Sequence, residues 1–189
     1  MHRSILAAAL AAAIAVPAFA VPQTYVLDST HSYPRFSYDH MGFSKQILRF
    51  NQTTGEVVLD RDAKKASVNV TIDMNSIDTG VDAFDKHMKS DEIFDTARFP
   101  TATFRSTKVT FAGDRPATVT GDLTIKGITK PVTLTVSSFS NKEHPMLKKD
   151  AIGANATGVI RRSDFNAGYG VPAIGDEVRL DIALEAVKK

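Results

Sequence analysis

Histidines and aspartates are the residues of this sequence whose side chains could carry out chemistry. The histidines beyond the first 20 residues are His31, His40, His87 and His144. No two of them have the H-x-H or H-x₃-H spacing that would place two imidazoles on one face of a strand or helix. A folded sheet could still bring two together, but lone histidines are more often hydrogen-bonded structural residues. The sequence therefore predicts no metal site.

Carboxylates are the second group that could act as acids and bases. The candidates are Asp28, Asp78, Asp85, Asp91 and Asp95. Most are predicted in turns or at helix ends, where aspartate caps backbone N–H groups, so a structural role is favoured. His31 and Ser32 do not form a nucleophile pair, because neighbours on a strand point to opposite faces. The sequence contains no nucleophile elbow, P-loop or zinc-protease helix, and no cysteine, and we predict no catalytic residue.

The elements that must position these residues are mostly strands with one buried and one wet face. Apolar residues alternate with polar ones over residues 67–72, 119–125, 132–137 and 178–186. Such alternation is typical of antiparallel sheets, because strands of parallel sheets are covered on both faces. Less regular strands are predicted at 25–28, 32–39, 46–51, 55–60, 101–111 and 152–162. Residues 127–130 are expected to turn a hairpin, with Pro131 starting the next strand. About eight to ten strands in one barrel are expected, an all-β fold.

One segment departs from this period. Over residues 81–90, Val81, Phe84 and Met88 recur at the spacing of an amphipathic helix, and Thr79 with Asp82 could form a capping-box-like start. A single helix beside a barrel would cover one end and place Phe84 and Met88 near an interior ligand. The alternative is that both residues only complete the core.

Small residues on one strand indicate interior space. Within 152–162, Ala154, Ala156 and Gly158 share a face and contribute little volume if they point inward. A barrel lined there by small side chains would keep an open interior. The alternative is that this face accommodates a crossing helix or a bend.

The N-terminus has the features of a secretory signal peptide. A short basic start precedes an apolar stretch over residues 5–16, and the small-x-small sequence Ala18-Phe19-Ala20 follows. A spanning helix would need about 20 apolar residues. Cleavage after Ala20 would leave Val21, which offers no thiol for a lipid anchor. We therefore expect residues 1–20 to be removed and residues 21–189 to form a single domain. That domain would lie in the periplasm or be secreted, without stable membrane insertion.

The charge balance excludes one class of partner. The sequence has 23 basic and 21 acidic residues, and the two signs are interspersed. A nucleic-acid-binding protein would be expected to show a basic stripe for the phosphate backbone. No nucleic-acid partner is predicted.

Short sequences along most of the chain resemble one known family. They are, in order, Asp28 through His31-Ser32; His40-Met41-Gly42-Phe43-Ser44; Ile77-Asp78-Thr79-Gly80; Asp85-Lys86-His87-Met88-Lys89-Ser90; Phe99-Pro100-Thr101-Ala102-Thr103-Phe104; Gly121-Asp122-Leu123-Thr124-Ile125; Gly127-Ile128-Thr129-Lys130-Pro131-Val132; Arg162-Ser163-Asp164-Phe165; and Gly175-Asp176-Glu177-Val178. Together they resemble the YceI-like, lipocalin-like family of bacterial polyisoprenoid-binding proteins. Two departures concern contacts with the ligand's head group: Phe84 stands where an arginine is common, and Pro145-Met146-Leu147 replaces a Pro-Trp-Gly stretch.

The resemblance implies an extended eight-stranded antiparallel barrel, with the helix of residues 81–90 near one end, around a long isoprenoid lipid. A bound polyisoprenoid or prenylated quinone is expected in place of a cofactor, and transient membrane contact is compatible with this function. The resemblance leaves a monomer and a homodimer open. The candidate ligand-binding residues are Phe36, Tyr38, Phe50, Phe84, Met88, Phe94, Phe104, Leu123 and Ile125. Each of them could equally be part of a filled core.

Two other functions remain as alternatives. A stress-related interaction module would have the same barrel without a lipid cargo, since a fold does not fix a function. A lipid-modifying enzyme would need polar groups at the cavity mouth, with His31, His40 or His87 as candidates. We predict a binding protein, not an enzyme.

Overall fold

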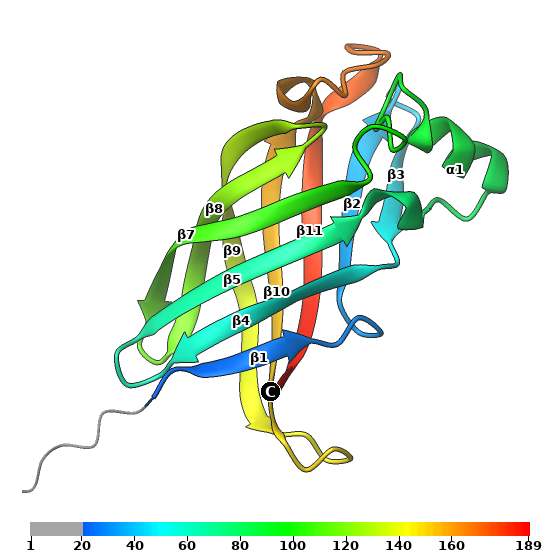
Figure 1. The fold of residues 1–189 in the computed structure, drawn as a ribbon. Helices are drawn as coiled ribbons and strands as arrows, with labels where there is room; N and C mark the ends of the chain where they lie inside the picture. The colour runs from blue at the N-terminus through cyan, green and yellow to red at the C-terminus, as the bar shows by residue number, and fades with distance from the viewer. Residues whose placement is uncertain (1–20) are drawn as a thin grey trace, which may run out of the picture.

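The structure is a computed structural model that describes residues 21–189, so the predicted signal peptide lies outside the described residues. It contains eleven strands and one α-helix (Figure 1). The strands are β1 (Gln23–Leu27), β2 (Tyr33–His40), β3 (Ser44–Phe50), β4 (Thr53–Asp60), β5 (Lys65–Asp73), β6 (Ile77–Asp78), β7 (Thr101–Ala112), β8 (Arg115–Ile125), β9 (Ile128–Glu143), β10 (Asp150–Arg161) and β11 (Ile174–Lys188). The helix α1 spans Asp82–Lys89, and two 3₁₀ turns span Met74–Ser76 and Arg162–Phe165.

Eight of the strands close a barrel. Their order is β1-β4-β5-β7-β8-β9-β10-β11, and β11 pairs again with β1. Each of these pairings is antiparallel. Closure leaves no edge strand exposed along this part of the wall. The predicted all-β, eight-stranded antiparallel barrel with one short helix is confirmed.

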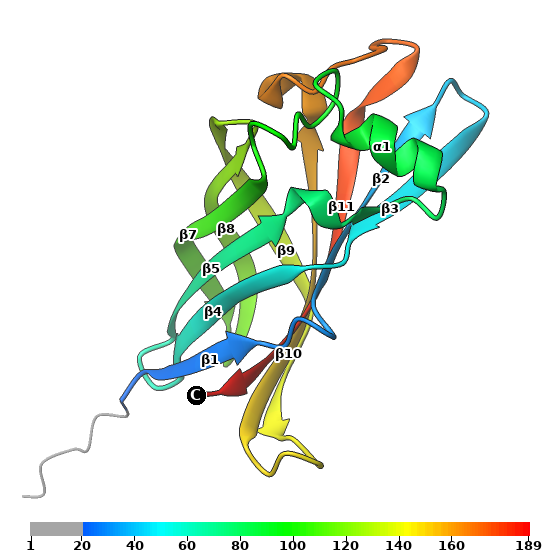
Figure 2. The ribbon, with the colours of Figure 1, turned by 45° about the vertical axis from the view of Figure 1, so that its right-hand side comes forward.

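The barrel is extended at one end by β2 and β3. The C-terminal part of β11 pairs with β1, whereas Val178 to Ala183 pair with β2, which in turn pairs with β3. Helix α1, the β2–β3 turn and residues 166–173 all lie at this end, which we call the helix end (Figure 2). The β9–β10 turn, residues 144–149, projects from the opposite end, which we call the hairpin end (Figure 1).

Alternation along the strands separates the interior from the surface. Tyr25 and Leu27 on β1 are buried, as are Val57 and Leu59 on β4. The outer face carries pairs of threonines on adjacent strands, for example Thr120 and Thr133, whose Oγ1 atoms lie 2.9 Å apart. Cross-strand pairs of this kind help to fix the register of a sheet.

Two predictions at the β8–β9 hairpin were wrong, the bounds of the turn and the position of Pro131. The β8–β9 hairpin turns at Lys126-Gly127, not at 127–130, since Ile125 pairs with Ile128. Both turn residues have positive φ (49° and 74°), the geometry of a two-residue hairpin turn that matches the twist of its strands. Pro131 therefore lies inside β9, opposite Asp122. Its missing N–H is tolerated because the pairing of β9 with β10 begins only at Thr135.

The start of α1 also differs from the prediction. Val81 occupies the N-cap position without a side-chain cap, and Thr79 contacts Asp85, not Asp82. The Thr79 amide and hydroxyl both donate to Asp85 Oδ1, at 2.8 and 2.7 Å. The carboxylate thus ties the segment before the helix to its first turn.

Candidate functional site

The barrel encloses a cavity of about 400 Å³. Its walls come from strands all around the barrel and from α1, and most of the lining side chains are aliphatic or aromatic. Sites for small molecules typically measure about 300–1,000 Å³ and are lined in this way. The interior is therefore large enough to hold an apolar ligand.

All nine predicted ligand-binding residues line this cavity. They are Phe36 and Tyr38 on β2, Phe50 on β3, Phe84 and Met88 on α1, Phe94 in the loop after α1, Phe104 on β7, and Leu123 and Ile125 on β8. The rings of Phe36, Phe50 and Phe94 pack together, with centroids 5.7 to 6.3 Å apart. These positions place the nine side chains within reach of a bound molecule. Their contact with a lipid stays a prediction.

The small residues of β10 face the same space. Ala154 and Ala156 line the cavity, whereas a Cβ on Gly158 would lie 2.8 Å from Leu134 Cδ2. Leu134 therefore fills the volume beside Gly158. The open volume next to β10 lies at the two alanines.

Five polar side chains lie together at the helix end, and the sequence analysis did not predict that they form a group. The cavity lining includes Tyr38 and His40 from β2, His87 from α1, Arg162 after β10, and Tyr169 in the following loop; we call these five the polar group. The rings of His87 and Tyr169 pack edge to face, 5.5 Å between centroids. His40 and His87, named for the enzyme alternative, are thus in the cavity wall, whereas His31 is not among its lining residues.

Arg162 is the charged centre of the polar group, and backbone carbonyls hold it in place. Nε–H donates to the carbonyl oxygen of Gly175, Nη1 to those of Ala167 and Tyr169, and Nη2 to that of Ile174, each at 2.8 Å. The signal for this residue was in the sequence, because Arg162 follows Ala154 and Ala156 at even spacing on the inward face. It was missed because a charged residue is not expected in an apolar wall.

Burial shifts the pKa values of two side chains of the polar group, Arg162 and Tyr38. Loss of water around the guanidinium lowers the pKa of Arg162, against the opposing charges of Asp176 and Tyr38. Burial likewise raises the pKa of Tyr38, while the charge of Arg162 acts in the opposite direction. Both shifts are expected for polar groups facing an apolar interior.

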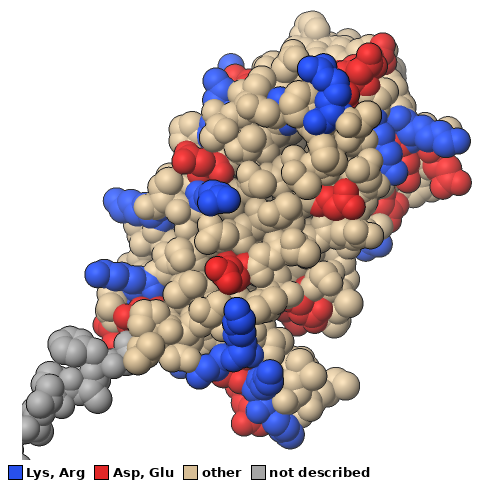
Figure 3. All heavy atoms as spheres, viewed as in Figure 1, with Lys and Arg blue, Asp and Glu red and all other residues tan. Residues whose placement is uncertain are grey.

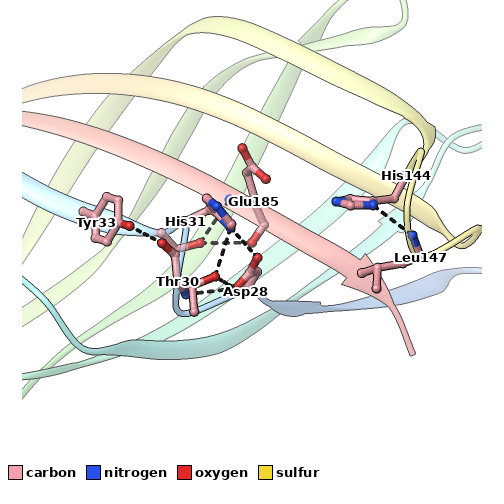
Figure 4. A network of polar contacts seen from close by, with 8 residues as sticks. Asp28, Thr30, His31, Tyr33, His144, Leu147 and Glu185 are labelled. Carbon is pink, nitrogen blue, oxygen red and sulfur yellow. Dashed lines mark hydrogen bonds and ion pairs between the residues drawn. The ribbon is translucent and has the colours of Figure 1, made fainter.

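A second polar cluster lies outside the cavity, where β1 leads into β2 (Figure 4). Asp28 accepts hydrogen bonds from the amide and hydroxyl of Thr30, at 2.8 and 2.6 Å, and its Oδ2 lies 2.7 Å from Nδ1 of His31. Asp28, His31 and Glu185 bring potential metal-ligand atoms within 4.8 Å of one another. The contacts within the cluster stabilise the turn, the structural role predicted for Asp28.

These contacts lower the pKa of Asp28 to about 2, chiefly through the Thr30 hydroxyl and then through His31. A lowered folded-state pKa stabilises the fold above the unfolded value near 3.8, and this contribution is lost as the pH falls through 2. Asp28→Asn is therefore expected to reduce the free energy of unfolding by about 1 kcal/mol at pH 5, after discounting for solvent screening, and by less at pH 2.

Urea unfolding at both pH values measures this effect. It is followed by far-ultraviolet circular dichroism in place of tryptophan fluorescence, because the sequence has no tryptophan. Asp114→Asn serves as the control, since the Asp114 side chain is exposed on the barrel surface and faces only Lys64. Equal losses at pH 5 and pH 2 would contradict the assigned role of Asp28.

The charged surface shows no single-sign stripe on the face drawn in Figure 3, where basic and acidic side chains are interspersed. Within residues 21–189, helix α1 is too short to cross a bilayer, and no other α-helix is present.

Comparison with known proteins places the barrel in a family. The family model described as a YceI-like domain matches residues 25–186. A UPF0312 protein of Vibrio vulnificus and protein YceI of Salmonella arizonae are each 36% identical to this chain, over 194 and 192 residues, with 100% of both sequences covered. The crystal structure of Burkholderia cenocepacia BcnA is 27% identical, with a TM-score of 0.73 over 85% of this chain and 99% of that one.

A polyisoprenoid-binding domain from Saccharophagus degradans, implicated in plant cell wall breakdown, has a TM-score of 0.66 over 88% of this chain and 99% of that one. At 20% identity this likeness concerns the fold alone. The family match over residues 25–186, the two relatives aligned over their full length and the closed barrel agree, and the chain belongs to the YceI-like family.

Proposed function

We propose that this protein binds a long isoprenoid lipid, a polyprenyl chain or a prenylated quinone, inside its barrel and carries or stores it in the periplasm. The observation that supports this most directly is the cavity of about 400 Å³, bounded by apolar side chains from all sides of the barrel. Family membership supports the class of ligand, and the Saccharophagus degradans domain of the same fold is a polyisoprenoid-binding protein.

Apolar contacts alone could provide the affinity. A tail of about 30 carbons, at about 0.3 kcal/mol per heavy atom, supplies about 9 kcal/mol. This free energy corresponds to a dissociation constant below about 1 μM. The proposed function thus requires no catalytic residue, and we propose a binding protein that is not an enzyme.

Export and domain organisation belong to the same proposal. Residues 1–20 would direct the chain out of the cytoplasm, and residues 21–189 would form one lipid-binding domain. Sequencing of the N-terminus of the protein from an extracytoplasmic fraction is expected to begin at Val21; an intact Met1 in that fraction would contradict cleavage.

Mass spectrometry of an organic extract tests the ligand. Protein purified without detergent from its native host is expected to yield a prenyl lipid or prenylated quinone in about equimolar amount. An extract without lipid, together with failure of the purified protein to take up added prenyl lipid, would favour the alternative of an interaction module without a cargo.

Exposed apolar side chains at the helix end support transient contact with a membrane. Met41, Phe43 and Ile47 of the β2–β3 hairpin are exposed, as are Val81 before α1 and Tyr169 in the loop before β11. Tyr169 also lines the cavity, so an exposed ring of this end forms part of the cavity wall. A lipid that leaves a bilayer here would avoid water, since exposed apolar patches of this kind favour membrane or protein contact. We propose that the helix end faces the bilayer during transfer.

Phe43→Ser is expected to reduce binding to vesicles of phosphatidylethanolamine and phosphatidylglycerol several-fold, because Phe43 is 88% exposed and would insert its ring. Co-sedimentation with the vesicles measures the effect. Met146→Ser is the matched control. Met146 is 84% exposed but lies at the hairpin end, so its replacement should leave vesicle binding unchanged. Equal effects of the two substitutions would argue against a membrane-facing helix end.

A further inference from the structure

We propose that the polar group at the helix end binds the head group of the lipid, that this head group presents oxygen acceptors, and that Tyr38 and Arg162 are the donors. The tail would then run along the apolar interior towards the hairpin end. This inference rests on the proposed function and adds to it the orientation of the lipid and the chemistry of its polar end.

Arg162 retains a donor and a positive charge for such a ligand. A guanidinium has five N–H groups, and four hydrogen bonds to backbone carbonyls account for all but one of them. Among residues 21–189 no carboxylate lies within ion-pair distance of Arg162. Neutral carbonyls orient the guanidinium without cancelling its charge, and the charge of Asp176 acts on it only from beyond ion-pair distance. An oxygen acceptor placed beside the guanidinium in the cavity would therefore be stabilised.

Tyr38 supplies a second donor. Its side chain lines the cavity from β2, opposite Val178 of β11, and its hydroxyl makes no hydrogen bond within the described part of the chain. Tyr38 and Arg162 are close enough for the charge of one to influence the pKa of the other. A half-buried hydroxyl without a partner favours a ligand atom that accepts a hydrogen bond from it.

The polar residues of the cavity wall outside the polar group offer no comparable donor. The hydroxyl of Ser32 donates to the Glu185 carbonyl and accepts from the Glu185 amide, both at 3.0 Å. The hydroxyl of Thr53 also lacks a hydrogen-bond partner, but its Oγ1 is buried and presents no accessible surface to a ligand. Arg35 is engaged by Asp181 at 3.0 Å. The accessible free donors are therefore concentrated at the helix end, where the exposed Tyr169 also lines the cavity.

Oxygen acceptors occur in two kinds of prenyl lipid, those ending in a phosphate and those ending in a quinone. Both would satisfy a phenol and a guanidinium N–H, whereas a cationic head group would be repelled by Arg162. The phosphate would gain additionally from the charge of Arg162, because a partly buried site screens that charge less than water does.

Three probes with the same number of chain carbons separate these contributions. Geranylgeranyl monophosphate, a geranylgeranyl benzoquinone and the headless hydrocarbon phytane are added to delipidated protein, and displacement of a neutral naphthylamine dye gives each affinity. Either headed probe, or both, should bind roughly tenfold more tightly than phytane. A preference for the phosphate identifies an anionic head group, and a preference for the quinone or equal binding identifies a neutral carbonyl acceptor.

Tyr38→Phe is the decisive variant, because it keeps the ring and removes only the hydroxyl. It is expected to weaken binding of the preferred headed probe by about tenfold and to leave phytane unchanged. Tyr33→Phe is the control: Tyr33 lies on the same strand, but its hydroxyl donates to the Thr30 carbonyl outside the cavity lining.

Two results would overturn this inference while leaving the lipid-binding proposal intact. One is equal binding of all three probes by the unmodified protein. The other is an equal loss for all three in Tyr38→Phe, which would assign Tyr38 to packing. If none of the probes displaces the dye, the proposed function itself fails.

Discussion

Ala154→Phe is expected to weaken prenyl-lipid binding by roughly 100-fold. Ala154 lines the cavity from β10, so a phenyl ring at this position would project into the space of the tail. Displacing about ten carbons of a bound tail, at about 0.3 kcal/mol each, would cost about 3 kcal/mol of binding free energy, or about two orders of magnitude in affinity. The fold should tolerate the ring, because it enters open volume and not a packed core.

Val159→Phe provides the matched control. Val159 lies on the same strand but points outward and is exposed, so the same ring would add no bulk to the interior. Dye displacement by geranylgeranyl benzoquinone measures affinity, and thermal unfolding verifies that both variants are folded. If Ala154→Phe is folded and binds the lipid as the unmodified protein does, the ligand does not occupy this part of the barrel.

Arg162→Met is expected to lower the free energy of unfolding by about 3 kcal/mol, and the melting temperature by roughly 6–12 °C. The guanidinium bonds four carbonyls between Ala167 and Gly175, and methionine would leave these acceptors without their donor. Because hydrogen bonds to a charged group are stronger than neutral ones, their loss should dominate over the gain from replacing a half-buried charge.

Arg161→Met is the control for this substitution. Arg161 is the exposed neighbour at the end of β10, so its replacement should change stability by less than about 0.5 kcal/mol. Differential scanning calorimetry of both variants measures the difference. Equal melting temperatures for Arg162→Met and the unmodified protein would show that the 167–175 segment does not depend on the guanidinium.

Alternation predicted much of the barrel. The strands β5, β8 and β11 were recognisable because one face of each is buried and the other is wet, and this local pattern survives in any antiparallel sheet. The helix was recognisable for the same reason, since Phe84 and Met88 recur on one face. Eight of the nine candidate residues lie on strands or on the helix predicted from periodicity, and Phe94 lies in the loop after the helix; the structure places all nine at the cavity.

The turn between β8 and β9 shows where local reasoning failed. Gly127 was expected to begin the turn, yet Lys126 also adopts a positive φ and the register moves accordingly. A turn two residues long is selected by the twist of the strands on either side. That twist depends on the whole sheet and is not encoded by the turn residues alone.

The sequence by itself determined the class of fold, the family, the inward faces of the strands and the helix that covers one end, because these depend on local periodicity and on short sequences in order. Only the tertiary structure decided that β11 pairs with β1 along one part and with β2 along another, that an open volume of about 400 Å³ remains, and that Tyr38 and Arg162 face it together. The physical reason is that closure of a barrel and the packing inside it depend on contacts between residues far apart in the chain. Each such contact is fixed by register and by the volume of its neighbours, and neither can be obtained from the period of a single strand.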